Sequence, residues 1–209
     1  MLKCVNKMIG EVYPGELNVI CSVTGGFKST GLYSLASDYI REGKKVLFIT
    51  LEVCKDRVKE YILSNLNDID IELIRSGEAL TQPWPEGQIK LNSLPAGIDA
   101  DEFKNHVEVM LEEFNSDVVI FDFVDLIGGD RNDMLQYLKL LECVLWTASQ
   151  KDRHWQISNS IMQENSPYDN IFSFIPTSST EIDTVLYQIK SAPPSYDTWG
   201  LDVNKSKIY

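Results

Sequence analysis

The chain of 209 residues has the length of one medium-sized domain, and 44% hydrophobic with 24% charged residues excludes a disordered or collagen-like chain. A formal net charge of −12 gives no overall basic character for holding a nucleic-acid backbone, although net charge does not say where the charges lie. The widely spread cysteines form no C-x-x-C pair, which argues against a zinc site or a disulfide framework. Because no segment has a signal-peptide core or a membrane-spanning apolar run, we expect a cytoplasmic protein without a membrane partner.

The first half of the chain alternates short apolar runs with amphipathic segments. Leu17–Val23 predicts a buried strand that enters a glycine turn, and Ser29–Arg41 predicts the helix that follows it. Lys45–Leu51 predicts a second buried strand, and Lys55–Asn67 predicts a second amphipathic helix. After a Pro-rich segment typical of a surface loop, Ile89–Leu94 predicts a short edge strand.

The second half continues the same alternation. We expect two helices and four strands, in the chain order helix Asp99–Phe114, strand Val118–Phe121, helix Met134–Glu142, and strands Cys143–Thr147, Ile171–Ile175 and Val185–Ile189. Strands that alternate with helices predict an α/β fold with a mostly parallel sheet and helices on both faces. We expect a single domain over residues 1–209, in which residues 1–14 are a lead-in and no separate N-terminal domain is present.

The segment Ser22–Thr30, with the sequence S-V-T-G-G-F-K-S-T, lies where a phosphate-binding loop is expected. Ligands of parallel α/β sheets bind at the carboxyl ends of the strands, and this segment joins a predicted strand to a predicted helix. In a phosphate loop, backbone N–H groups, a lysine and a hydroxyl hold the phosphates and Mg²⁺. The expected nucleotide contacts are Thr24, Gly25, Gly26, Lys28, Ser29 and Thr30.

This loop departs from the pattern G-x-x-x-x-G-K-[ST] at two positions, because Ser22 and Phe27 stand where the pattern has glycine. A glycine before the lysine lets the backbone approach the phosphates without a Cβ in the way, so Phe27 is expected to crowd a nucleotide. Gly25 and Gly26 offer compensation by shifting the turn. Taken alone, the segment is equally compatible with an ordinary glycine turn before a helix.

Three further strand ends carry polar residues suited to nucleotide hydrolysis. Glu52 is placed to act as a base toward an attacking water, and Asp122 is placed to hold Mg²⁺ together with Ser29. Gln150 is placed to sense a γ-phosphate. The alternatives are a solvated strand-end charge for Glu52 and a metal-facing role for Asp125 instead of Asp122. The four strand ends together predict a site for ATP and Mg²⁺.

The segments GELNVICSVTGGFKSTGLYSLASDYIREGKKVLFITLE, DVVIFDFVDLI, ECVLWTASQ and LYQIKS resemble DnaB-type replicative helicases, nearest to the motor domains of those of T-even bacteriophages. The resemblance covers roughly residues 15–209. It implies a RecA-like P-loop NTPase that hydrolyses ATP and translocates along single-stranded DNA. It also implies a homo-oligomer, a hexameric ring, with primase or other replication proteins as partners in the cytoplasm of a phage-infected host cell.

The resemblance also assigns roles to individual residues. Lys28 and Ser29 would bind phosphate and Mg²⁺, Glu52 would activate water, Asp122 would serve the metal, and Gln150 would report the nucleotide state. Lys190 would reach into the nucleotide site of a neighbouring subunit, but Ala192 stands where the family has an arginine finger. Such a finger commonly supplies a factor of about 10³–10⁵ in rate. Glu164 would lie in the loop that faces DNA.

Two main hypotheses remain open from the sequence. The first is an active helicase motor. The second is a catalytically impaired relative that acts as a non-enzymatic binding or assembly partner in phage DNA replication, which Phe27, Ala192 and the short connection from Leu126 to Glu142 favour. A RecA-like regulatory or recombination ATPase shares the fold, but the segments SLASDY, LWTASQ and YQIKS point away from it.

Overall fold

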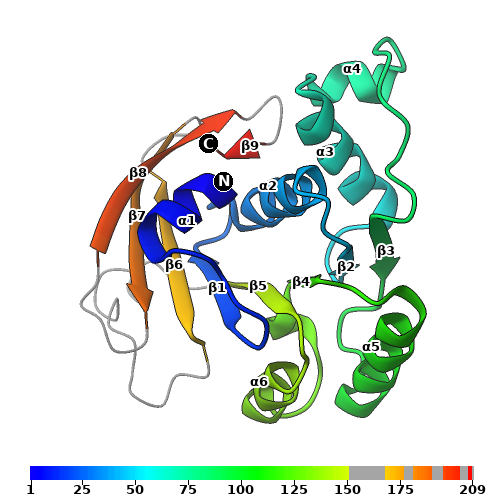
Figure 1. Cartoon of the computed structure of the whole chain (residues 1–209), viewed down its shortest axis with the longest axis vertical. Helices are drawn as coiled ribbons and strands as arrows, with labels where there is room; N and C mark the ends of the chain where they lie inside the picture. The colour runs from blue at the N-terminus through cyan, green and yellow to red at the C-terminus, as the bar shows by residue number, and fades with distance from the viewer. Residues whose placement is uncertain (151–167, 177–180, 190–194, 203–206, 209) are drawn as a thin grey trace.

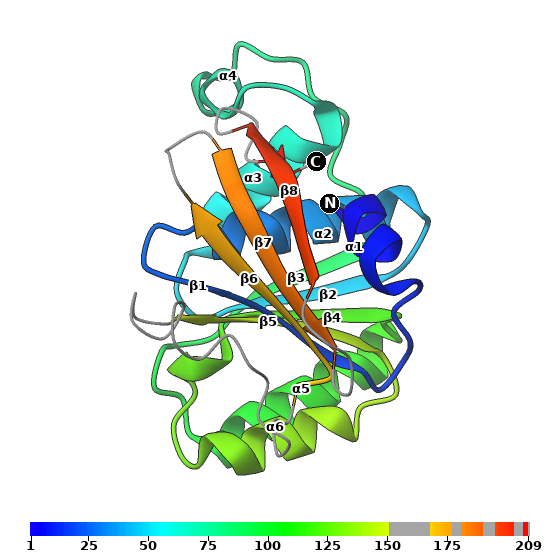
Figure 2. The same ribbon diagram turned by 90° about the vertical axis from the view of Figure 1, so that its left-hand side faces the viewer.

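The computed structural model of the chain describes residues 1–150, 168–176, 181–189, 195–202 and 207–208. These residues form a nine-stranded sheet with the strand order β3-β2-β4-β5-β1-β6-β7-β8-β9. Helices lie on both faces of the sheet (Figure 1). Turned by 90°, the molecule shows α1, α2 and α3 on one side of the strands and α5 and α6 on the other (Figure 2). The expected α/β fold with helices on both faces is confirmed.

The strands from β3 to β6 in this order run parallel, and β7, β8 and β9 continue the sheet antiparallel. The expectation of a mostly parallel sheet is therefore confirmed. The strand bounds are β1 Leu17–Ser22, β2 Val46–Thr50, β3 Ile89–Ser93, β4 Val118–Asp122, β5 Val144–Gln150, β6 Asn170–Pro176, β7 Glu181–Ile189, β8 Ser195–Asp202 and β9 Lys207–Ile208.

Two layers of apolar side chains hold the helices on the sheet. Alternate residues of the central strands point to opposite faces, so in β2 Phe48 packs toward α2 and α3 while Leu47 packs toward α5. No helix among the described ranges is long and apolar enough to cross a membrane. The helix bounds are α1 Leu2–Ile9, α2 Lys28–Arg41, α3 Lys55–Asn67, α4 Ile71–Ser76, α5 Ala100–Phe114 and α6 Arg131–Lys139, with a short 3₁₀ helix η1 at Val124–Leu126.

Several element boundaries differ from those expected from sequence. β5 extends beyond Thr147 to Gln150, because the polar residues at its end are still paired with β1. α6 begins at Arg131 rather than Met134, since the side chain of Asp130 accepts hydrogen bonds from the first turn of the helix. Helices α1 and α4 and strands β8 and β9 were not predicted.

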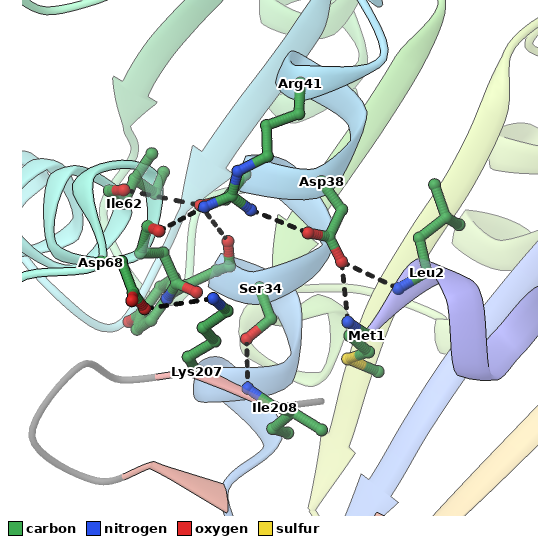
Figure 3. A network of polar contacts seen from close by, with 12 residues as sticks. Met1, Leu2, Ser34, Asp38, Arg41, Ile62, Asp68, Lys207 and Ile208 are labelled. Carbon is green, nitrogen blue, oxygen red and sulfur yellow. Dashed lines mark hydrogen bonds and ion pairs between the residues drawn. The ribbon is translucent and has the colours of Figure 1, made fainter. Parts of the chain in front are cut away.

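Helix α2 also holds the first and last described segments of the chain (Figure 3). The Asp38 carboxylate accepts hydrogen bonds from the Met1 nitrogen at 2.7 Å and the Leu2 nitrogen at 2.9 Å. The hydroxyl of Ser34 accepts a hydrogen bond from the Ile208 nitrogen at 2.9 Å. Lys207 pairs with Asp68, just after α3, at 3.2 Å. The helix that begins at Lys28 is thereby anchored at its far end.

Candidate nucleotide-binding site

The sheet brings the predicted site residues to one edge, where the parallel strands end. In the pairing of β1 with β5, Ser22 lies opposite Gln150. In the pairing of β2 with β4, Thr50 lies opposite Asp122, and Glu52 follows two residues later. The segment Ser22–Thr30 crosses this edge between β1 and α2. The arrangement is that of a ligand site in an open α/β sheet.

The backbone of the loop has left-handed conformations at the turn. Gly25 has φ 72°, and Phe27, which directly precedes α2, has φ 64° and ψ 19°. A left-handed conformation costs a residue with a Cβ about 1–2 kcal/mol. The half-buried Phe27 side chain packs against the apolar layer that contains α2. Phe27 is therefore accommodated in a backbone conformation for which glycine is the usual residue.

Ser22 and Gly26 are complementary in shape. The Ser22 hydroxyl donates a hydrogen bond of 2.7 Å to the Phe174 carbonyl of β6, so its side chain is fixed in the buried interior. A Cβ on Gly26 would lie 1.8 Å from this hydroxyl oxygen. The serine at the first position of the loop thus occupies the space that Gly26 leaves open.

Lys28 lies inside the loop. Its side chain is 8% exposed, and its ammonium group donates a hydrogen bond of 3.3 Å to the Val23 carbonyl at the start of the loop. Burial lowers the pKa of Lys28, while the nearby carboxylates of Glu52 and Asp122 oppose this shift. A buried lysine whose ammonium group lies beside the backbone of the loop is suited to bind an anion there.

Ser29 and Asp122 form the second contact beneath the loop. The Ser29 hydroxyl donates a hydrogen bond of 3.0 Å to Oδ1 of Asp122, which is fully buried. Burial raises the pKa of Asp122 to about 6, and the Ser29 hydrogen bond and the charge of Lys28 act in the opposite direction. A carboxylate beside a hydroxyl is an oxygen donor set that suits Mg²⁺. The residues present therefore fit this ion.

Asp125, the alternative to Asp122, is already engaged with protein donors. Its carboxylate accepts hydrogen bonds from the Ser149 hydroxyl at 2.8 Å and the Gln150 nitrogen at 3.1 Å. It also pairs with Arg131 at 2.8 Å, and Arg131 in turn contacts the Tyr168 hydroxyl at 2.7 Å. Asp122 is instead the carboxylate that the Ser29 hydroxyl contacts, and this contact favours Asp122 over Asp125 as the residue that would face a metal.

Gln150 and Glu52 complete the predicted set within the described ranges. The Gln150 amide donates a hydrogen bond of 2.8 Å to the Thr24 hydroxyl, which joins the end of β5 to the loop. Glu52 is exposed, and its charge acts on both Lys28 and Asp122. The predicted Lys190 and Glu164, like Ala192, lie outside the described residues.

Sequence reasoning missed Tyr33 and Arg131, which also contact the site. Tyr33 lies one helical turn after Ser29, and its hydroxyl is 3.4 Å from Oδ2 of Asp122. The spacing of four residues along a predicted helix was a usable signal, since such residues share a face. Arg131 had no sequence signal, because its contact with Asp125 depends on where α6 begins.

Comparisons with known proteins show which sequences and folds this chain is similar to. No family model matches the chain. The chain is 27% identical to the DnaB-like replicative helicase of Enterobacteria phage T4, over an alignment of 195 residues that covers 78% of this chain and 41% of that protein. Among solved structures, it matches an isolated ATPase domain with a TM-score of 0.71 and 12% identity, covering 94% of this chain and 85% of the other. The chain is similar to DnaB-like replicative helicases.

A second solved structure supports the DnaB-like fold. It is that of a DnaB-like replicative helicase studied with its interactions with primase, with a TM-score of 0.72 and 13% identity, covering 99% of this chain and 60% of the other. The RecA-like fold and the resemblance inferred from the sequence are confirmed. The chain spans about two fifths of the length of the phage T4 relative.

Proposed function

We propose that this chain is a phage-type replicative DNA helicase motor domain that binds ATP with Mg²⁺ and couples ATP hydrolysis to translocation along single-stranded DNA. The observation that carries the proposal is the pairing of Ser29 with the buried Asp122 beneath a loop that encloses Lys28. A hydroxyl, a carboxylate and a lysine at the start of a helix are the groups that a nucleoside triphosphate with Mg²⁺ requires. Similarity to DnaB-like helicases supports the same function.

Each residue at the sheet edge has a role in this proposal. Lys28 would bind the β- and γ-phosphates, and the backbone around Gly25 and Gly26 would contact the phosphate oxygens, with Thr24 and Thr30 beside them. Ser29 and Asp122 would hold Mg²⁺, which when bound offsets the negative charge of the phosphates. Glu52 would accept the proton of the attacking water. Gln150 would exchange its bond to Thr24 for one to the γ-phosphate.

The proposal extends to assembly and partners. A hexameric ring would bring Lys190 of one subunit to the nucleotide site of the next. Single-stranded DNA would contact the segment around Glu164. Primase or other replication proteins are the proposed partners, which is supported by a solved DnaB-like relative that was studied with primase. The proposed site of action is the host cytoplasm.

A second candidate is a catalytically impaired relative that serves as a binding or assembly partner. Phe27 favours this candidate, because it directly precedes Lys28 at a position where the phosphate-loop pattern has glycine, and its side chain is expected to crowd a nucleotide. Ala192 favours it as well, since the sequence lacks the arginine expected there. In this case the nucleotide would stay bound without turnover, or would not bind.

ATP turnover by the purified protein, with and without single-stranded DNA, separates the two candidates. The motor predicts turnover that DNA stimulates and that Lys28→Ala abolishes. Lys44→Ala is the control and should have no effect, because Lys44 is exposed and follows the C-terminal end of α2. Absence of turnover in the wild type at saturating Mg²⁺ and ATP would contradict the motor. Restoration of turnover by Phe27→Gly would then locate the defect at the loop. A measurement of the molecular mass in solution tests the proposed hexameric ring, which predicts the mass of a hexamer.

A further inference from the structure

Tyr33 presents a second donor to the carboxylate that Ser29 contacts. Its hydroxyl lies 3.4 Å from Oδ2 of Asp122, while the Ser29 hydroxyl lies 3.0 Å from Oδ1. Because Ser29 and Tyr33 are four residues apart on α2, one face of this helix supplies a donor to each oxygen of the carboxylate. Both oxygens of Asp122 are thereby fixed by the helix that begins at the loop.

The Tyr33 ring is itself held in place. It stacks on Tyr61 of α3 with ring centres 5.0 Å apart and an interplanar angle of 7°, and it packs at 5.8 Å against Phe48 of β2. Tyr33 is 3% exposed. A tyrosine hydroxyl carries one proton that it can donate. The position of this hydroxyl is therefore set by packing from two other elements.

We infer that Tyr33 is a positioning residue that orients the Asp122 carboxylate toward Mg²⁺. The inference rests on the proposed function, since it assumes that Ser29 and Asp122 hold the ion. Ser29 would hold the ion through its hydroxyl oxygen and could still donate the hydroxyl proton to Asp122 in a hydrogen bond. Tyr33 is not one of the residues proposed to hold the ion, and its hydroxyl reaches the second oxygen of the carboxylate. Partners of this kind fix the direction of a metal ligand.

The Tyr33→Phe variant tests this role with little disturbance, because it removes the hydroxyl and keeps the stacked ring. The measurement is the affinity for a fluorescent, non-hydrolysable ATP analogue over a series of Mg²⁺ concentrations and in EDTA. We expect the Mg²⁺ concentration at half-saturation to rise about tenfold, the lower end of the range for such partners because the bond is long. The affinity in EDTA should be unchanged. Tyr61→Phe is the matched control, since it removes a hydroxyl from the stacked partner without touching Asp122.

The outcomes separate the role of Tyr33 from the proposed function. An unchanged Mg²⁺ dependence in Tyr33→Phe overturns the role of Tyr33 while nucleotide binding by the wild type stands. An equal loss of affinity with and without Mg²⁺, or the same shift in Tyr61→Phe, shows a general structural effect and also overturns it. A wild-type protein that binds no analogue at any Mg²⁺ concentration overturns the proposed function, and the role of Tyr33 with it.

Discussion

Phe27 stands in the segment Ser22–Thr30 at a position where the phosphate-loop pattern has glycine. Its backbone is left-handed, yet the loop retains a buried Lys28 and a bond from Ser29 to Asp122. The side chain packs partly against the apolar layer of α2, which offsets some of the backbone cost. Phe27 therefore has two opposing effects on the free energy of unfolding: its left-handed backbone lowers it, and the packing of its ring raises it.

Two substitutions at Phe27 separate these contributions. Phe27→Ala and Phe27→Gly both remove the ring, but only glycine relieves the left-handed backbone. We expect Phe27→Gly to have a free energy of unfolding about 1 kcal/mol larger than that of Phe27→Ala. Urea denaturation of the two variants measures this difference. Equal stabilities, or a more stable alanine variant, would show that the residue is not left-handed in solution.

The sequence predicted the residues of the site whose position follows from strand order. Asp122 and Gln150 could be predicted because polar residues that end buried parallel strands meet at one edge of a sheet. The sequence predicted Asp122 and left Asp125 as the alternative, and only the structure shows that Ser149 and Arg131 contact Asp125. Tyr33 was missed because helical spacing alone does not show that its hydroxyl reaches across to β4.

At the scale of elements, the loop between β1 and α2 is fitted to β6. Ser22 is bound to the Phe174 carbonyl of β6, and Gly26 lies directly over the Ser22 side chain. The loop, its preceding strand and β6 therefore form one packed unit. A side chain added at Gly26 would displace the Ser22 hydroxyl from β6 or move the loop.

Gly26→Ala tests this fit. Because the new Cβ would lie 1.8 Å from the Ser22 oxygen, we expect a loss of about 1–3 kcal/mol in the free energy of unfolding. The double variant Ser22→Gly with Gly26→Ala should recover part of the loss, since it removes the colliding hydroxyl. Thermal denaturation of the single and double variants measures the coupling. Additive effects without recovery would show that Ser22 and Gly26 do not share this space.

Most elements with a clear apolar pattern were predicted, whereas helix α1 and the short strand β9 were not. The strands β1, β2 and β4 are buried apolar runs, so their sequence alone indicates them. Helix α1 was missed although Leu2, Val5 and Ile9 recur at helical spacing, and in the structure Leu2 and Val5 pack on the layer around α2. The two residues of β9 are a strand only through their pairing with β8.

At the scale of the whole molecule, α2 joins the site to the rest of the fold. Its first turn carries Lys28 and Ser29. Its middle carries Tyr33 and also Ser34, which binds Ile208, and Asp38 in its last turn binds Met1. The net charge of −12 is compatible with a triphosphate site, because the phosphates would interact with positive groups close to them and not with the charge of the whole chain. The fold similarity to the solved DnaB-like replicative helicase covers 99% of this chain.

Calorimetric titration with a non-hydrolysable ATP analogue in Mg²⁺ tests most directly whether Ser22–Thr30 is a nucleotide site. The account predicts that the wild type and Lys44→Ala bind the analogue equally. It predicts that Lys28→Ala binds it about 10–100-fold more weakly, the effect of losing one charge-assisted contact to phosphate. Equal affinity in all three proteins, or no binding by the wild type, would contradict it.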